Sequence, residues 1–104
     1  MKSKNLTTWD LDVVMAAAAS NDVVAMVDTL EKMLQKLVAD AQRVGLGVGD
    51  IQRHPIIVLL STSILNEAVG MDWDEYCIRA KEKALSECIL LRKQLFQYTK
   101  GKPK

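Results

Sequence analysis

The chain has 104 residues, enough for one domain around a single hydrophobic core. Apolar residues make up 49% of it and aromatic residues only 5%, so the core must be built mainly from aliphatic side chains and methionine. A net charge of +1 excludes a strong overall attraction to nucleic acid or to an anionic membrane. No apolar run approaches the length of about 18 residues that a membrane span needs. We therefore expect a cytoplasmic protein with no contact to a membrane.

The cysteines and the N-terminus agree with that location. Cys77 and Cys88 are eleven residues apart, a rise of about 16 Å if they share a helix. A disulfide needs Cα atoms within about 7 Å, so these two cannot pair within one chain. Asp10 and Asp12 interrupt the place where the apolar part of a signal peptide would begin.

The first predicted helix covers residues 8–19, after a loose tail at residues 1–7. Thr7 or Thr8 is a suitable N-cap, and Asp10 and Asp12 favour the positive end of the helix dipole. One face of this helix is apolar, formed by Leu11, Val14, Met15 and Ala18.

A second helix, residues 22–44, follows a break at Ser20–Asp22. On one continuous helix the apolar stripes before and after this point are rotated by roughly 110°, so a single straight helix could not bury both. Ser, Asn and Asp are also preferred N-cap residues. The second stripe repeats with helical spacing over three heptads, and Gly45 just beyond it is a natural C-cap.

The stretch from Gly45 to His54 is expected to be a flexible connector. Its glycines resemble those of a phosphate-binding loop, but they follow a helix instead of a strand and no Lys-Ser/Thr pair comes after them. Pro55 suits the first position of a third helix, residues 55–69, and Gly70 ends it. The first half of this helix is apolar all round.

The fourth predicted helix, residues 72–98, starts at Asp72 and is followed by a basic tail at residues 99–104. It has two apolar faces. The first is rich in small residues and comprises Trp73, Cys77, Ala80, Ala84, Cys88, Leu91 and Leu95. The second lies about 120° round the helix and comprises Ile78, Leu85, Ile89 and Phe96. A helix with two apolar faces needs two neighbours.

These elements predict an all-α, antiparallel four-helix bundle that forms a single domain and self-associates, most simply as a homodimer. In a lone bundle each helix buries one face and exposes the other, and large apolar patches are rare on monomers. The apolar surfaces of the third and fourth helices exceed that limit, so either the third helix is sandwiched inside the monomer or these faces meet another chain. The expected interface residues are Ile56, Ile57, Leu60, Ile78, Leu85, Ile89 and Phe96.

Catalytic and metal-binding signatures are weak. His54 is the only histidine and is best interpreted as a helix N-cap or an exposed residue; with two distant cysteines it forms no zinc signature. Acidic pairs at i, i+3 hold Mg²⁺ in the helical dimers of MazG-type nucleotide pyrophosphatases, and Asp28–Glu31 and Asp72–Glu75 have that spacing. The resemblance is architectural and covers no motif. We therefore predict no catalytic, metal or cofactor site.

A non-enzymatic interaction or regulatory module, acting by homo-oligomerisation and protein binding, is the function that the sequence favours. One alternative is a nucleic-acid-associated accessory protein that uses the C-terminal helix and tail, with Arg79, Lys83, Arg92 and Lys93 as a basic surface. A second is a small-molecule-binding helical dimer or a divergent MazG-like metal-dependent nucleotide hydrolase. No stretch of the sequence identifies a family.

Overall fold

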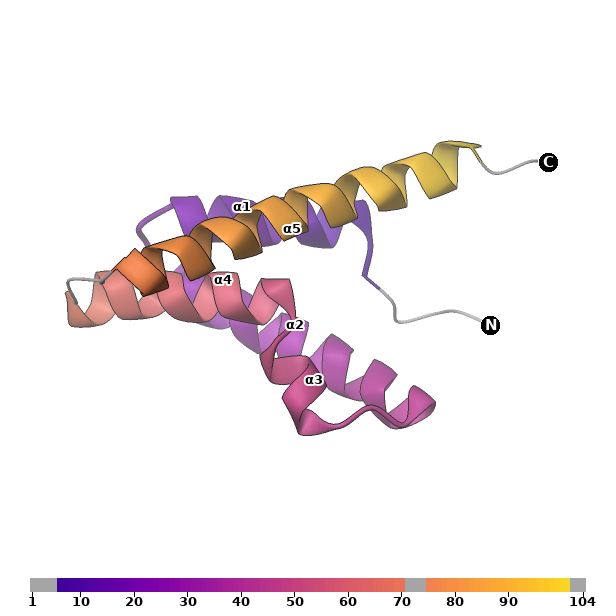
Figure 1. Ribbon diagram of the computed structural model, residues 1–104, viewed down its shortest axis with the longest axis horizontal. Helices are drawn as coiled ribbons and strands as arrows, with labels where there is room; N and C mark the ends of the chain where they lie inside the picture. The colour runs from indigo at the N-terminus through magenta and orange to yellow at the C-terminus, as the bar shows by residue number, and fades with distance from the viewer. Residues whose placement is uncertain (1–5, 71–74, 102–104) are drawn as a thin grey trace.

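A computed structural model describes residues 6–70 and 75–101, with the side chains of residue 76 and of residues 98–101 excepted. Within these ranges the protein is helical and has no strand (Figure 1). The elements in chain order are α1 Thr8–Ala19, α2 Val23–Val44, α3 Val48–Gln52, α4 Pro55–Ile64, a π-helical segment Leu65–Val69, and α5 Glu75–Gly101. The predicted start of the last helix at Asp72 lies outside the described residues.

The break between the first two helices is confirmed. Helix α1 ends at Ala19, Asn21 has a positive φ of 60°, and α2 begins after Asp22. Two local contacts hold this corner: the Asp22 backbone N–H donates to Ser20 Oγ at 3.0 Å, and the Asp22 carboxylate accepts from the Ala25 N–H at 3.2 Å. Side-chain capping therefore turns the chain where the two apolar stripes change phase.

The expected flexible connector between Gly45 and His54 is wrong in part, because it contains the short helix α3. Gly45 caps α2 with a φ of 81°, as predicted. The Gly47 backbone N–H then donates to the Asp50 carboxylate at 3.1 Å, and this bond closes the first turn of α3. A single turn of five residues has no apolar periodicity, so the spacing of apolar residues could not indicate it.

Helix α4 begins at Pro55, as predicted. The Nδ1 atom of His54 caps it by accepting from the Ile56 N–H at 3.2 Å. The helix packs against α1, α2 and α5, so three neighbours cover its circumference. After Ile64 the chain widens into the π-helical segment and ends at Gly70, whose φ is 68°.

Because α4 is enclosed within one chain, the expected role of Ile56, Ile57 and Leu60 in an oligomer interface is wrong. Their side chains are 0%, 9% and 0% exposed. Leu11 and Val14 of α1 are also fully buried in the same core. Apolar composition alone could not tell whether helices of the same chain or of a second chain cover α4.

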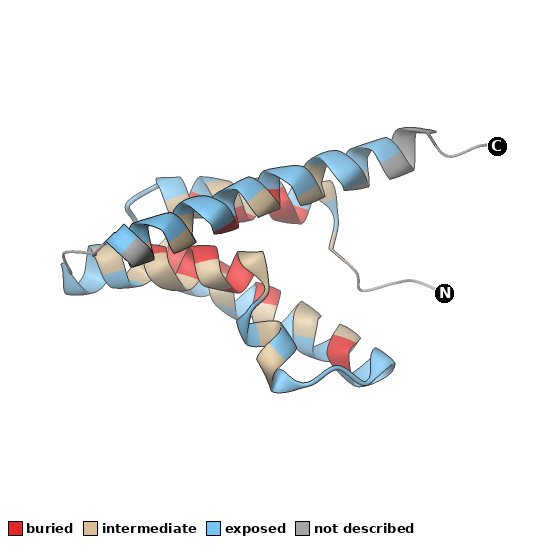
Figure 2. Ribbon diagram, viewed as in Figure 1, coloured by how far each residue is buried: buried red, intermediate tan, exposed pale blue. Residues whose placement is uncertain are grey.

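Helix α5 lies along α1 and α4 (Figure 1). Ala84 and Cys88, from the small-residue face, are buried against these neighbours, which small side chains allow to come close. The outer side of α5 is exposed (Figure 2). No helix among the described residues is long and apolar enough to span a membrane.

Candidate functional site

The outer side of α5 carries a line of exposed apolar side chains, which we call the α5 stripe: Ile78, Leu85, Ile89 and Phe96. They are 46%, 39%, 41% and 51% exposed, in that order. At 100° per residue these four positions fall within an arc of about 40° on the helix. Helices α1 and α4 pack on the other apolar face of α5, so the α5 stripe lies on a side of the helix that stays partly exposed.

Two charged residues share the face of the α5 stripe. Glu82 lies between Ile78 and Leu85 in sequence, is exposed, and stands about 40° from the centre of the stripe on one side. Arg92 stands at a similar angle on the other side, and its guanidinium donates from Nε and from Nη2 to the carboxylate of Asp12 on α1. The hydrogen bond and the charge of Asp12 raise the pKa of Arg92. Asp12 thus fixes Arg92 beside the apolar stripe.

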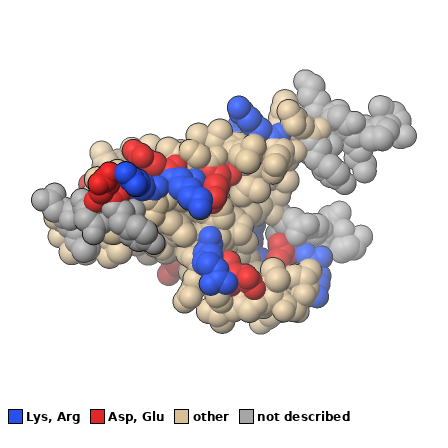
Figure 3. All heavy atoms as spheres, in the orientation of Figure 1, with Lys and Arg blue, Asp and Glu red and all other residues tan. Residues whose placement is uncertain are grey.

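The residues expected to form a basic surface do not all gather on one side of α5, although Arg79 and Lys83 line one pocket together with Arg53. Arg79 is paired with Glu75 at 2.6 Å, and Arg92 is paired with Asp12. Lys83 and Arg92 point to opposite sides of α5, because they differ by about 180° round the helix. On the face shown in Figure 3, Lys and Arg atoms lie beside Asp and Glu atoms. This mixture favours a solvated surface over a site for phosphate groups.

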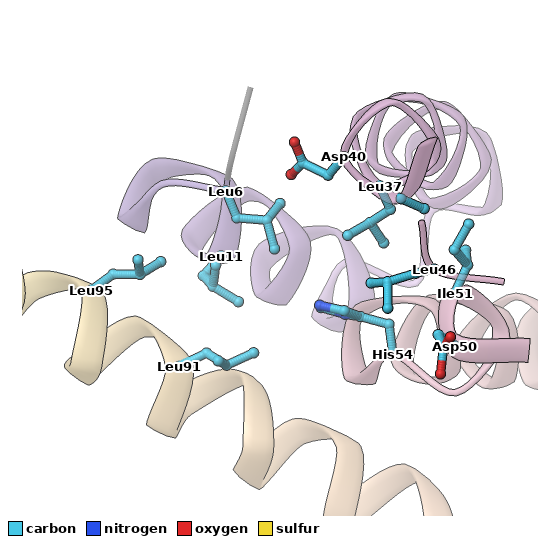
Figure 4. Close-up of a pocket in the computed structure, with 11 residues that line it drawn as sticks. Leu6, Leu11, Leu37, Asp40, Leu46, Asp50, Ile51, His54, Leu91 and Leu95 are labelled. Atoms are coloured by element: carbon cyan, nitrogen blue, oxygen red, sulfur yellow. The ribbon is translucent and has the colours of Figure 1, made fainter. Parts of the chain in front are cut away.

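A cavity of about 410 Å³ lies where α2 and α3 diverge from α1 and α5. Leucine side chains from α1, α2 and α5 point into it, and the His54 ring faces the same space (Figure 4). Burial lowers the pKa of His54, and the charge of Glu87 offsets only part of this effect. The cavity is therefore lined mainly by apolar side chains, together with Asp40, Asp50 and the imidazole of His54, and it could hold a small, mainly apolar group.

Among the described residues, no three His, Cys, Asp or Glu side chains lie close enough to share a metal ion. Asp28 is paired with Lys32, and Glu75 with Arg79, while Asp72 lies outside the described residues. Burial, assisted by the charge of Glu87, raises the pKa of Cys88 to about 11, so its thiol stays protonated at neutral pH.

Asp10 forms the centre of a buried polar cluster that was not predicted from the sequence. The Asp10 side chain is fully buried, accepts from the Thr7 N–H at 2.7 Å and the Thr7 hydroxyl at 2.9 Å, and pairs with the Lys36 ammonium at 2.6 Å. Burial acts to raise the pKa of Asp10, but Lys36 and Thr7 together outweigh it and the pKa is lowered. The Thr-x-x-Asp spacing is typical of a capping box and could have indicated the Thr7 contact. No local pattern points to Lys36.

Comparison with protein-family models, with curated proteins and with solved structures finds no match to this chain.

Proposed function

We propose that this protein is a non-enzymatic helical interaction module that self-associates through the α5 stripe and acts by binding protein. The single observation that carries the proposal is the exposure of four large apolar side chains in line on one face of a long helix. The opposite face of the same helix is already packed on α1 and α4. A second chain is the simplest way to cover what remains.

Symmetry supports a second copy as the first partner to consider. A two-fold interface brings the same surface of both chains together, so a straight apolar stripe can meet its own copy. We interpret α1, α2, α4 and α5 as a four-helix bundle in a cytoplasmic protein, with α5 on its outer side. The packing of α4 on the other three long helices is consistent with this arrangement.

The exposed fractions set the strength expected of such a dimer. Complete burial of a Leu, Ile or Phe side chain contributes roughly 1.5–3 kcal/mol. Since 39–51% of each stripe residue is still exposed, the stripes of two copies contribute roughly 5–12 kcal/mol when they are covered. Association costs about 4–15 kcal/mol in lost freedom of motion. Because these two amounts are of the same order, we expect at most a dimer of modest affinity, whose population rises with concentration.

Sedimentation of wild-type protein up to about 100 μM, the range in which a dimer of about −6 to −8 kcal/mol is populated, tests the proposal. Wild-type protein should form dimers, and Ile89→Glu should remain monomeric because it places two like charges within an apolar contact. The matched control is Val24→Glu, since Val24 is 78% exposed on α2 and lies away from α5. Circular dichroism verifies that both variants fold. A wild-type monomer at every concentration, or equal effects of both variants, refutes the proposal.

A further inference from the structure

The charged residues on the outer face of α5 complete a regular pattern with the α5 stripe. Taken together, the six positions are Ile78, Glu82, Leu85, Ile89, Arg92 and Phe96. Successive members are four, three, four, three and four residues apart, which is the spacing of the contact positions of a coiled coil. This face of α5 therefore fits another helix along its length, and it presents one acidic and one basic residue within the line of contact.

The residues along this face are arranged symmetrically about Glu87, with opposite charges at one pair of equivalent positions and apolar residues at the others. Counting outward from Glu87, the positions five residues away are Glu82 and Arg92. The positions two residues away are both aliphatic, Leu85 and Ile89. Those nine residues away, Ile78 and Phe96, are both large and apolar. When α5 packs antiparallel on a copy of itself, each charged residue therefore faces a residue of opposite charge, and each apolar residue faces an apolar one.

We propose that a second copy of this chain docks antiparallel on α5, with the two-fold axis at Glu87, an inference that rests on the proposed self-association. In this register Glu82 faces the partner's Arg92, Leu85 faces the partner's Ile89, and Ile78 faces the partner's Phe96. Each contact occurs twice because the interface is symmetric. The interface then contains two interchain ion pairs, one on each side of a central apolar cluster.

Other arrangements of the same two helices are less favourable. A parallel pair places each residue against its own copy, so Glu82 meets Glu82 and Arg92 meets Arg92 within an apolar contact. An antiparallel pair shifted by one heptad sets Arg92 against Ile89 in one direction and Glu82 against Leu85 in the other, so a charged residue faces an apolar one in either case. The pattern therefore selects against these alternatives as well as for the proposed register.

Helix α1 prepares Arg92 for this contact. Asp12 accepts from Nε and from Nη2 of Arg92, and a guanidinium has five N–H donors, so further donors are available to the partner's Glu82. A side chain that is already held in place loses less freedom when a partner binds. In the same register Arg79 and the partner's Lys93 flank the contact, and Glu75 neutralises Arg79 through an ion pair at 2.6 Å.

Charge exchange tests the register in the full-length protein. Glu82→Arg sets two like charges opposite each other at both ends of the interface. The double variant Asp12→Lys/Arg92→Glu introduces the same repulsion at the Arg92 position, because two acidic side chains then face each other. It keeps an ion pair between α1 and α5 with the two charges exchanged. We expect each to weaken the dimer by about tenfold at low salt. The triple variant Glu82→Arg/Asp12→Lys/Arg92→Glu should return to within about threefold of the wild-type Kd, because both ion pairs are restored in reverse.

Two controls and the possible outcomes separate this inference from the self-association on which it rests. Glu31→Arg, an equal charge change on the exposed side of α2, and Lys83→Glu, on another side of α5, should leave the Kd unchanged. A wild-type protein that does not dimerise refutes both the proposed function and the register. A dimer that Ile89→Glu dissociates, but whose Kd the charge exchanges do not change or the triple variant does not restore, refutes only the register.

Discussion

The buried ion pair between Asp10 and Lys36 ties the start of α1 to the middle of α2, and Lys36→Met should reveal its contribution to stability. Methionine keeps an apolar stem of similar length and removes the ammonium that lies 2.6 Å from the Asp10 carboxylate. Asp10 is fully buried and would retain only its hydrogen bonds from Thr7. Removing one partner of a fully buried ion pair costs about 3–5 kcal/mol. Because the Lys36 side chain is 36% exposed, we expect a smaller loss of about 2 kcal/mol.

Urea unfolding followed by circular dichroism, at one fixed protein concentration, measures this loss. The matched control is Lys32→Met, one turn earlier on α2, whose partner Asp28 is exposed; exposed pairs contribute at most about 0.5 kcal/mol. The pKa of Asp10 is lowered in the folded protein, so its ion pair stabilises the fold at neutral pH. That contribution disappears as the pH falls below about 3.8 and Asp10 becomes protonated. Equal losses for the two variants at pH 7, or a difference between them that does not shrink as the pH falls below about 3.8, would contradict this reasoning.

Two further predictions concern polar groups next to the core. Burial lowers the pKa of His54, and its Nδ1 must be unprotonated to accept from the Ile56 N–H, so stability should fall as the pH drops below about 6.5 through the folded pKa. His54→Asn keeps an N-cap that does not titrate, and thermal unfolding between pH 7 and pH 5 should show a smaller decline for it than for wild-type protein. Ser63 is buried in α4, and its hydroxyl has no hydrogen-bond partner among the described residues. Ser63→Ala should therefore leave the free energy of unfolding unchanged or raise it by up to about 1 kcal/mol, and a loss above 1 kcal/mol in urea unfolding would indicate a missed hydrogen bond.

Most helix boundaries could be predicted because they depend on residues close in sequence. Pro55 starts α4, Gly45 and Gly70 end their segments with positive φ angles, and Asp22 caps α2. Each of these effects comes from the backbone preference or the side chain of one residue. Local chemistry of this kind is visible without knowledge of tertiary contacts.

The features that could not be predicted depend on contacts between distant parts of the chain or on very short elements. Lys36 and Asp10 are 26 residues apart, and Arg92 and Asp12 are 80 residues apart. Helix α3 is five residues long and has no fully buried side chain, although Ile51 packs partly against the core, so it is too short to show a repeating pattern of apolar residues. The π-helical segment after Ile64 likewise differs from an α-helix by one residue per turn, which apolar spacing over five residues cannot resolve.

Only part of the candidate interface could be predicted from the number of apolar helix faces. The sequence has more apolar helix faces than a lone bundle of four helices buries, and we expected the excess on the third and fourth predicted helices. The enclosure of α4 by α1, α2 and α5 removes Ile56 and Leu60 from any surface. It leaves the α5 stripe exposed along a helix whose other apolar face is occupied. Only α5 therefore supports a second chain, and the order of its charged residues adds a direction and a register that apolar residues by themselves could not provide.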